Sequence, residues 1–247
     1  MQELDLPDVR VLQAQLHVLS QLLAWSNHEF VSCTTALQAL ADIVQEEIGY
    51  PQFGIGLVGE DGVLRFAAGY GIPDDLKQTL TVAPGQGVVG WVLEHGAPLN
   101  VPDITHEPRY RGLFPETRAE VCVPLRTRNQ ILGVINVESP QGNAFGEDDV
   151  LLLTALANGA SGILARLLRR EHTEQERAER FRQLSPREKQ VLRELAAGKS
   201  NKDIARALQM KVHTVEHHVT AILKKLELGS RHEAGQWARE NRMFENS

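Results

Sequence analysis

Three helix-start motifs follow one another in the last quarter of this 247-residue chain, and they constrain its local structure most. In each motif an acid follows a serine by three residues, with the serines at Ser185, Ser200 and Ser230. The serine oxygen can accept a hydrogen bond from a first-turn N–H, and the acid can reach back to the cap. The motifs and the apolar spacing between them predict a compact bundle of short helices, with the first three over residues 186–197, 201–208 and about 212–226.

The third of these predicted helices has two distinct faces. Its inward stripe consists of Val215, Val219, Ile222, Leu223 and Leu226. The opposite face steps by 4, 3 and 4 residues, through His213, His217, Thr220 and Lys224. Only residues 209–211 separate this helix from the one before it. So tight a turn is typical of a helix-turn-helix, whose second helix lies in the DNA major groove, although a three-helix bundle without a DNA role has the same periodicity.

The net charge of the chain changes sign at Ser185, where the predicted helical bundle begins. Residues 185–247 contain 12 Lys and Arg against 8 Asp and Glu, a net charge of +4. Residues 1–184 contain 14 against 24, a net charge of −10, in agreement with −6 for the whole chain. A small basic domain attached to an acidic one favours a domain that binds phosphate groups.

The run LSPREKQVL…GKSNKDIARAL…TVEHHV…ILKKL…SRHEA resembles the LuxR-type DNA-binding domain from Leu184 to about Trp237. The resemblance implies an all-α four-helix domain over residues 184–247 that binds double-stranded DNA. Ser200, Asn201 and Lys202 then begin the helix that lies against the DNA backbone, and Lys202 and Thr214 contact phosphate. Glu216, His217 and Thr220 take the base-reading positions, with Lys224 one turn further on.

This chain departs from the family pattern at three positions. Lys211 replaces a capping Ser or Thr, so we expect the third helix to start less firmly. Glu227 stands where a glycine commonly ends that helix, and Gly229 is expected to take over this role. Glu216 replaces a lysine, which suggests selectivity for a base amine at that position. His213 and His217 have metal-ligand spacing, but no Cys or Asp lies near them in sequence, and no metal site is predicted.

Composition limits the class of protein. The length suffices for two modest domains. Two cysteines, Cys33 and Cys122, indicate a reducing compartment. No signal peptide opens the sequence, and the uncharged run over residues 150–165 is too short to span a membrane. We therefore expect a cytoplasmic protein with no membrane partner.

The first two-thirds of the chain change from helical to strand periodicity and back. Helices are expected over residues 9–25, 33–48, 87–95 and 147–181. Hairpins are expected where residues 53–58 meet 63–68, and where 121–126 meet 131–137. This order of helix, antiparallel sheet and closing helix predicts an α+β domain.

The runs GQGVVGWVLEHGAPLNVPDITHEPRY, EVCVPLRTRNQILGVINVES and FGEDDVLLLTALANGAS resemble a GAF domain. The resemblance implies a GAF-like domain with a six-stranded antiparallel sheet and flanking helices. It also implies a small-molecule pocket on one face of the sheet and dimer helices on the other. We assign residues 1–168 to this sensor domain, with an N-terminal dimerisation helix, and residues 169–183 to a polar helical linker.

The pocket wall is expected between the central helix and the second hairpin. Its candidate ligand-binding residues are Trp91, Asp103, Tyr110, Arg111, Arg118, Glu120 and Cys122. Arg109, Arg111 and Arg118 cluster in sequence, which suits an anionic ligand; the alternative is a surface loop with ordinary arginines. No cofactor is evident, and an unidentified small-molecule effector is the candidate ligand.

Two apolar seams with steps of 3 and 4 residues suggest a homodimer. The first contains Val9, Leu12, Leu16, Leu19 and Leu23, and the second contains Leu153, Leu156, Ala160, Ile163 and Leu167. Paired across two subunits they would form a four-helix dimer core; alternatively, both stripes cover their own sheet.

Together these features predict a bacterial transcriptional regulator that binds DNA and answers to a signal sensed by its N-terminal domain, with RNA polymerase as a further candidate partner. The alternative is a constitutive regulator whose GAF domain is a ligand-free dimerisation module. An enzyme is disfavoured because nucleophile-elbow, phosphate-loop and paired-cysteine motifs are missing. A phosphorylated receiver domain does not fit the hairpins, and an acyl-homoserine-lactone receptor does not fit the few Trp and Tyr residues.

Overall fold

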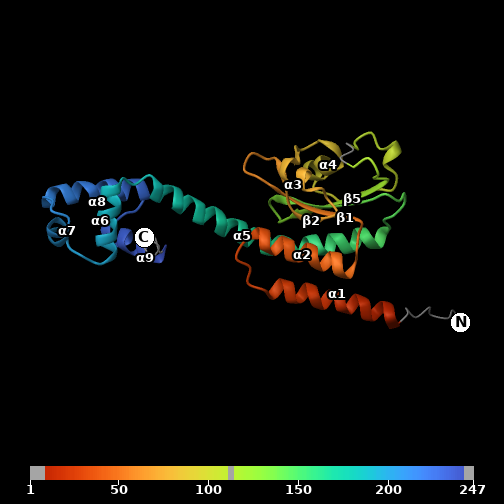
Figure 1. Cartoon of the computed structure of the whole chain (residues 1–247), viewed down its shortest axis with the longest axis horizontal. Helices are drawn as coiled ribbons and strands as arrows, with labels where there is room; N and C mark the ends of the chain where they lie inside the picture. The colour runs from red at the N-terminus through yellow and green to blue at the C-terminus, as the bar shows by residue number, and fades with distance from the viewer. Residues whose placement is uncertain (1–8, 111–113, 242–247) are drawn as a thin grey trace. The chain divides into compact units, whose positions relative to one another are not determined.

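The chain forms two compact units, unit 1 (Met1–Arg169) and unit 2 (Arg170–Ser247). The structure, a computed structural model, describes residues 9–110 and 114–241, without the side chains of residues 9–16 and 19. Helices and strands are labelled in Figure 1.

Unit 1 is built on a six-stranded antiparallel sheet of order β3-β2-β1-β6-β5-β4. The strands are β1 (Gln52–Val58), β2 (Leu64–Tyr70), β3 (Thr81–Val82), β4 (Leu99–Val101), β5 (Ala119–Arg126) and β6 (Ile131–Ser139). Both predicted hairpins, β1–β2 and β5–β6, are confirmed. The sequence did not predict β3 and β4, because strands of two and three residues are too short to show a period of two.

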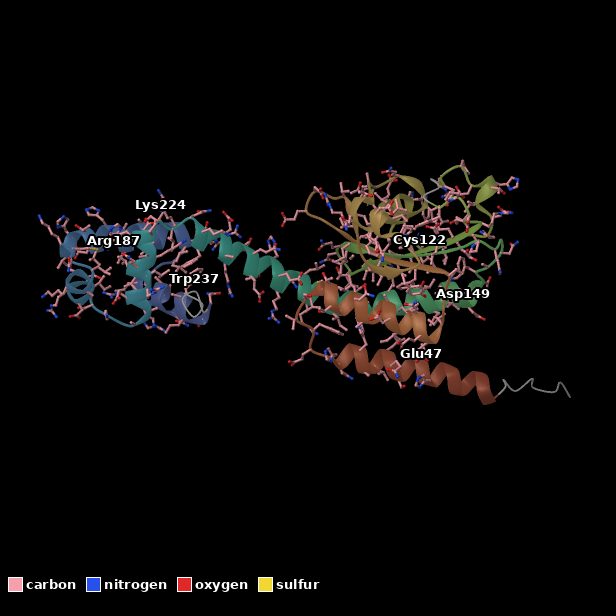
Figure 2. All side chains as sticks on the ribbon, viewed as in Figure 1. Glu47, Cys122, Asp149, Arg187, Lys224 and Trp237 are labelled. Atoms are coloured by element: carbon pink, nitrogen blue, oxygen red, sulfur yellow. The ribbon has the colours of Figure 1, made fainter. Side chains whose placement is uncertain are left out.

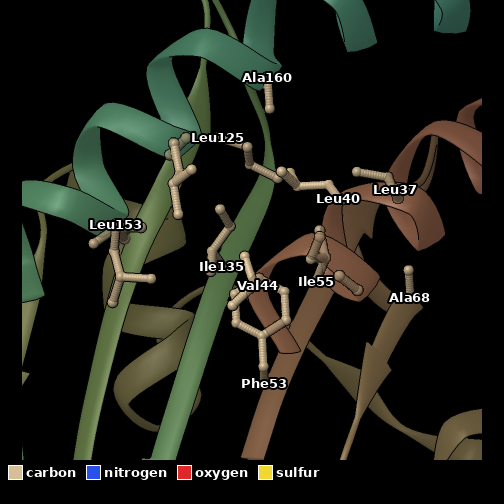
Figure 3. Packing of buried hydrophobic residues seen from close by; sticks show 14 of the residues in the cluster. Leu37, Leu40, Val44, Phe53, Ile55, Ala68, Leu125, Ile135, Leu153 and Ala160 are labelled. Carbon is tan, nitrogen blue, oxygen red and sulfur yellow. The ribbon is translucent and has the colours of Figure 1, made fainter. Parts of the chain in front are cut away.

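Helices cover both faces of this sheet (Figure 1). One face carries α2 (Cys33–Glu47) and the first half of α5 (Glu147–Arg182), with α1 (Val9–Asn27) beyond α2. The other face carries α3 (Asp74–Thr79) and α4 (Gly87–His95), and a short 3₁₀ helix, η1 (Ile104–His106), follows β4. In the core of the first face, Leu40 and Val44 of α2 pack with Phe53 of β1 (Figure 3). The α+β prediction and the predicted helices of this region are confirmed.

The second predicted dimer seam is wrong. Leu153, Leu156, Ala160, Ile163 and Leu167 are all at most 8% exposed and belong to the core of unit 1 itself. The stripe therefore covers its own sheet, because α5 has to bury one apolar face to close the domain. In the first seam, Leu23 is 63% exposed, and the side chains of Val9, Leu12, Leu16 and Leu19 lie outside the described residues.

In the described part of the chain, α5 is the one helix with the length and apolar composition to cross a membrane. Its apolar residues are those buried against the sheet of unit 1, and its second half is rich in charge. Packing within the domain therefore accounts for this composition.

Unit 2 contains the predicted bundle of four helices. They are α6 (Pro186–Ala196), α7 (Asn201–Ala207), α8 (Val212–Leu226) and α9 (Arg231–Glu240). The inward stripe of α8 is confirmed for Val215, Val219, Ile222 and Leu226, while Leu223 is partly buried. These side chains share one core with Leu192 of α6 and Ile204 of α7.

The three serine caps are confirmed. The Oγ atoms of Ser185, Ser200 and Ser230 accept from the backbone N–H three residues later, at 3.2, 3.3 and 3.2 Å. At Ser185 the acid also caps in return, which completes a capping box, since the Ser185 N–H donates to Glu188 Oε2 at 2.7 Å. At the start of α8, Lys211 makes no side-chain cap, which agrees with the sequence prediction.

The prediction that Gly229 ends α8 is wrong. Glu227 itself takes the left-handed conformation, with φ of 55°, and the Leu228 N–H donates back to Leu223 O at 2.9 Å. Such a helix end requires positive φ one residue after the last helical residue, so the position is set by the helix length and not by the nearest glycine.

Candidate functional site

The turn between α7 and α8 is held by backbone hydrogen bonds. Gln209 has φ of 53°, and the Met210 N–H donates to Ala205 O at 2.8 Å. From α6, the Arg187 guanidinium donates to Leu208 O. The two short helices therefore form a helix-turn-helix, in which α8 is the second helix.

The outer face of α8 carries the predicted base-reading residues. His213, Glu216, His217, Thr220 and Lys224 are all exposed, and Figure 2 shows Lys224 pointing away from the bundle. The Thr220 hydroxyl donates to Glu216 O at 3.0 Å, so its oxygen can still accept. This face therefore combines a carboxylate, imidazoles, a hydroxyl and an ammonium, the groups that contact base edges and phosphates.

The predicted backbone-contacting residues lie at the starts of α7 and α8. Lys202 is exposed and Thr214 is half-buried, while the Ser200 hydroxyl is engaged in its helix cap. The Asn201 side chain accepts from Arg231 Nη1 at 3.0 Å. Sequence reasoning missed Arg231 as the residue that orients Asn201; its place in the third cap motif, directly after Ser230, was the available signal.

A half-buried ion pair fixes α8 on α6. Glu188 is 6% exposed, and its Oε2 lies 2.7 Å from Lys225 Nζ. Burial acts to raise the pKa of Glu188, but the hydrogen bond from Lys225, together with those from Ser185, outweighs it and lowers the pKa. Because Lys225 adjoins Lys224, this pair sets how α8 presents its outer face.

Unit 1 contains a cavity of about 120 Å³ between the sheet and the α3–α4 side. Its wall is mostly apolar, from Ile55, Leu64, Phe66, Ile72, Val88 and Val134. Gly54 and Gly56 of β1 also line it. A Cβ at Gly56 would lie 2.4 Å from Leu64 Cδ2, and one at Gly54 would lie 3.0 Å from Ile72 Cδ1. Because glycine has no side chain, Leu64 and Ile72 can occupy the space beside Gly56 and Gly54.

The polar groups of this cavity are acids and amides. Glu120 of β5 and Glu138 of β6 are directly opposed in the sheet, and they are 4% and 6% exposed. The Thr117 hydroxyl donates to Glu138 Oε2 at 2.7 Å, and Asn136 Nδ2 donates to Oε1 at 3.2 Å. Burial, and then repulsion from Glu138, raises the pKa of Glu120 to about 8.

Of the predicted pocket residues, Tyr110 and Glu120 line the cavity. Trp91, Asp103, Arg118 and Cys122 do not, and Arg111 lies outside the described residues. Two members of the predicted arginine cluster, Arg109 and Arg118, do not line the cavity, because nearby acids bind them. Arg118 pairs with Asp103 at 3.0 Å, and Arg109 pairs with Glu107 at 2.6 Å. The described charged groups of the cavity wall are therefore acids, and the anionic ligand expected from sequence stays a prediction, since Arg111 lies outside the described residues.

Both thiols are buried. Cys122 points to the cavity side of the sheet, as its alternation predicted, but it is covered in the apolar cluster with Val88 and Val92 of α4. Burial raises the pKa of the Cys122 thiol. Cys33 is 3% exposed in the core on the opposite face.

These observations define a two-part protein, a ligand-sized cavity under an antiparallel sheet joined to a helix-turn-helix. Residues 32–165 match the GAF domain family, and the chain belongs to that family. Residues 182–238 match the bacterial regulatory proteins of the luxR family. The chain is thus a fusion of a GAF domain with a LuxR-type helix-turn-helix, and it is homologous to transcriptional regulators.

Curated relatives support this assignment. The chain is 33% identical over 134 residues to the Nif-specific regulatory protein of Azospirillum lipoferum, covering 49% of this chain and 20% of the relative. It is 40% identical over 103 residues to the nitrate/nitrite response regulator protein NarL of Escherichia coli K12, covering 38% and 47%. The chain thus spans less than half the length of either protein.

Solved structures share the fold of unit 1. The GAF domain of a phosphoenolpyruvate-protein phosphotransferase from Coxiella burnetii matches with a TM-score of 0.58 and 19% identity, over 65% of this chain and 98% of that one. A free methionine-R-sulfoxide reductase from Neisseria meningitidis matches with a TM-score of 0.57 and 20% identity, over 65% and 93%.

Proposed function

We propose that this protein is a bacterial transcriptional regulator in which α8 reads double-stranded DNA and the GAF domain senses a small molecule. The main support for the DNA-reading role is that α8 has one buried apolar face and one exposed polar face. Val215, Val219 and Ile222 are buried, while Glu216 and His217 are exposed on the other side, directly after a tight turn. This is the arrangement that a helix in the major groove requires.

Individual roles follow from side-chain chemistry. Lys202 and Thr214 donate to phosphate oxygens, which position the helix without reading sequence. Glu216 accepts from cytosine N4, and His217 and Thr220 contact neighbouring base edges, with Lys224 at the far end of the face. Ser200 and Asn201 shape the start of α7, where the helix meets the DNA backbone.

Selection of DNA duplexes by the full chain, followed by fluorescence anisotropy, tests this role. We expect Lys202→Ala to weaken binding to all duplexes about equally, and to reduce the slope of log K against log salt by about 1. Glu216→Ala should instead change the preferred base at one position, by about 1–3 kcal/mol. Arg182→Ala, which removes an equal charge from an exposed residue of α5, is the matched control. Equal weakening by all three variants would contradict the proposal.

The protein is further proposed to act as a homodimer, since helix-turn-helix proteins commonly read two half-sites one helical turn apart. A groove of about 310 Å³ lies between α1 and α5, and its walls include Leu22, Leu23, Leu152 and Ala155. Leu23 is 63% exposed there, which supports this groove as the contact surface. Analytical ultracentrifugation should show a dimer at micromolar concentration, and Leu23→Asp should shift it to monomer; a wild-type monomer with and without DNA contradicts this part.

The proposal includes no catalytic role and places the protein in the cytoplasm, where bacterial DNA is, with RNA polymerase as a further partner. Burial of Cys33 and Cys122 supports a binding role for the GAF domain, because neither thiol is open to a substrate. An assay for peroxide- or sulfoxide-dependent turnover should give none above a Cys33→Ser/Cys122→Ser double variant.

A further inference from the structure

Glu120 and Glu138 form an arrangement that the fold itself does not need. They are cross-strand partners, which places their Cβ atoms about 4.5–5.5 Å apart, and like charges in that position are destabilising. Both are more than nine-tenths buried. Among the residues that the structure describes, no Lys, Arg or His nitrogen lies within ion-pair distance of either carboxylate.

Hydrogen-bond acceptors outnumber donors at this end of the cavity. Glu138 receives one donor on each oxygen, from Thr117 and Asn136. The donor that faces Glu120 is the same Asn136 amide, so the two carboxylates share it. The Oδ1 atom of Asn136 is buried in the same wall and also has no partner. A cavity that offers unmatched acceptors favours a ligand that brings N–H donors and a positive charge.

The rest of the wall restricts the ligand further. Leu64, Phe66 and Val134 present apolar surface, and the volume of about 120 Å³ admits only a small body. An ammonium group supplies three donors in a compact charge, which suits two carboxylates and an amide oxygen. An anion would face two carboxylates.

We propose that this cavity binds a small organic cation, with a protonated primary amine held by Glu120, Glu138 and the Asn136 carbonyl and an apolar body against Leu64 and Phe66. Binding of the cation does not depend on DNA. Only the expectation that the cation changes DNA affinity rests on the proposed function. The ammonium can belong to a simple amine or to an amino acid, and the ligand panel distinguishes the two.

Isothermal titration calorimetry of the full-length protein at pH 8 tests the site, with butylamine, butanol, butyrate and norvaline as probes. We expect butylamine or norvaline to bind at least about tenfold more tightly than butanol, and butyrate not to bind. Tighter binding of norvaline than of butylamine identifies the ligand class as amino acids, and the reverse as simple amines. Equal binding of butylamine and butanol, together with no binding of norvaline, overturns the proposal.

Variants separate the site from the fold. Glu120→Gln keeps the shape of the side chain and removes its charge, so amine affinity should fall by about tenfold or more while butanol affinity stays unchanged. Glu94→Gln, on the exposed part of α4, is the matched control and should bind as the wild type does. Unchanged amine affinity in both Glu120→Gln and Glu138→Gln overturns the assignment.

DNA affinity is measured separately, by anisotropy with and without butylamine. Amine binding without any effect on DNA affinity leaves the cation site standing and contradicts the proposed sensing role. No amine binding in a protein that still reads DNA contradicts the cation site alone.

Discussion

Glu120 in unit 1 and Glu188 in unit 2 are both buried carboxylates, but their surroundings differ. Glu188 meets Lys225 at 2.7 Å and two groups of Ser185, and its pKa is lowered. Glu120 meets another glutamate across the sheet, and its pKa is raised, first by burial and then by Glu138. Removal of a buried acid that is paired with a cation leaves that cation unpaired and destabilises the fold, whereas an acid without a cation is available to a ligand at a cost in stability.

The largest expected effect is on the pH dependence of unit 1. The folded protein keeps a proton on Glu120 that the unfolded chain has lost, so stability should fall as pH rises from about 5 to about 8, by the order of 3 kcal/mol. Urea unfolding across this range measures it, and Glu120→Gln should flatten the curve. The other groups coupled to Glu120 are Glu138, Glu107, Tyr110 and Cys122. An unchanged slope in Glu120→Gln would assign the effect to one of them.

Removal of Glu188, the buried acid that is paired with a cation, should lower the stability of unit 2 at neutral pH. Glu188→Ala removes the partner of Lys225 and one half of the Ser185 capping box, so unit 2 should lose about 2 kcal/mol. Calorimetry of the full chain should show this in the transition of unit 2. Glu240→Ala removes an exposed acid from α9 and is the control. Equal stability of the two variants would show that Glu188 does not stabilise unit 2, and would contradict the difference drawn between Glu188 and Glu120.

A smaller gain is expected at the end of α8. Glu227 is held at φ of 55°, a conformation that glycine adopts without steric cost. Glu227→Gly should therefore stabilise unit 2 by about 1 kcal/mol, even though it removes the exposed ion pair with Arg180. Glu233→Gly, at a helical position with ordinary φ, should instead be destabilising. Chemical denaturation followed by Trp237 fluorescence distinguishes them.

The smallest effect concerns the arginine that sequence reasoning placed in the pocket. Arg118 pairs with Asp103 at an exposed site outside the cavity wall. Arg118→Ala should leave both the thermal midpoint of unit 1 and its amine affinity unchanged within error, in contrast to Glu120→Gln. A loss of amine binding in Arg118→Ala would show that the loop contributes to the ligand site.

The sequence was most informative where structure is local. The caps at Ser185, Ser200 and Ser230 and the stripe from Val215 to Leu226 depend on residues three or four apart, and all are confirmed. The bounds of α8 were predicted correctly, but its left-handed end residue was assigned to Gly229, whereas Glu227 takes that conformation.

Long-range pairings account for the other errors. Glu120 was predicted as a pocket residue, but its partner Glu138 lies on the next strand and was missed; the register of the predicted β5–β6 hairpin contained that information. The arginines were grouped because they are close in sequence, whereas Arg118 bonds to Asp103, fifteen residues away. The stripe from Leu153 to Leu167 suits a partner helix or a sheet equally well in sequence, and the core of unit 1 decided between them.

The uncapped start of α8 provides a built-in reporter of phosphate contact. The Lys211 carbonyl accepts from the amides of Thr214 and Val215, at 3.0 and 3.2 Å, which leaves Val212 and His213 as first-turn amides without a side-chain acceptor from Lys211. In free protein these two amides should exchange with deuterated solvent almost as fast as in a disordered peptide. A bound duplex should slow their exchange through its phosphate oxygens, so occupancy of DNA can be followed in real time in the unmodified protein.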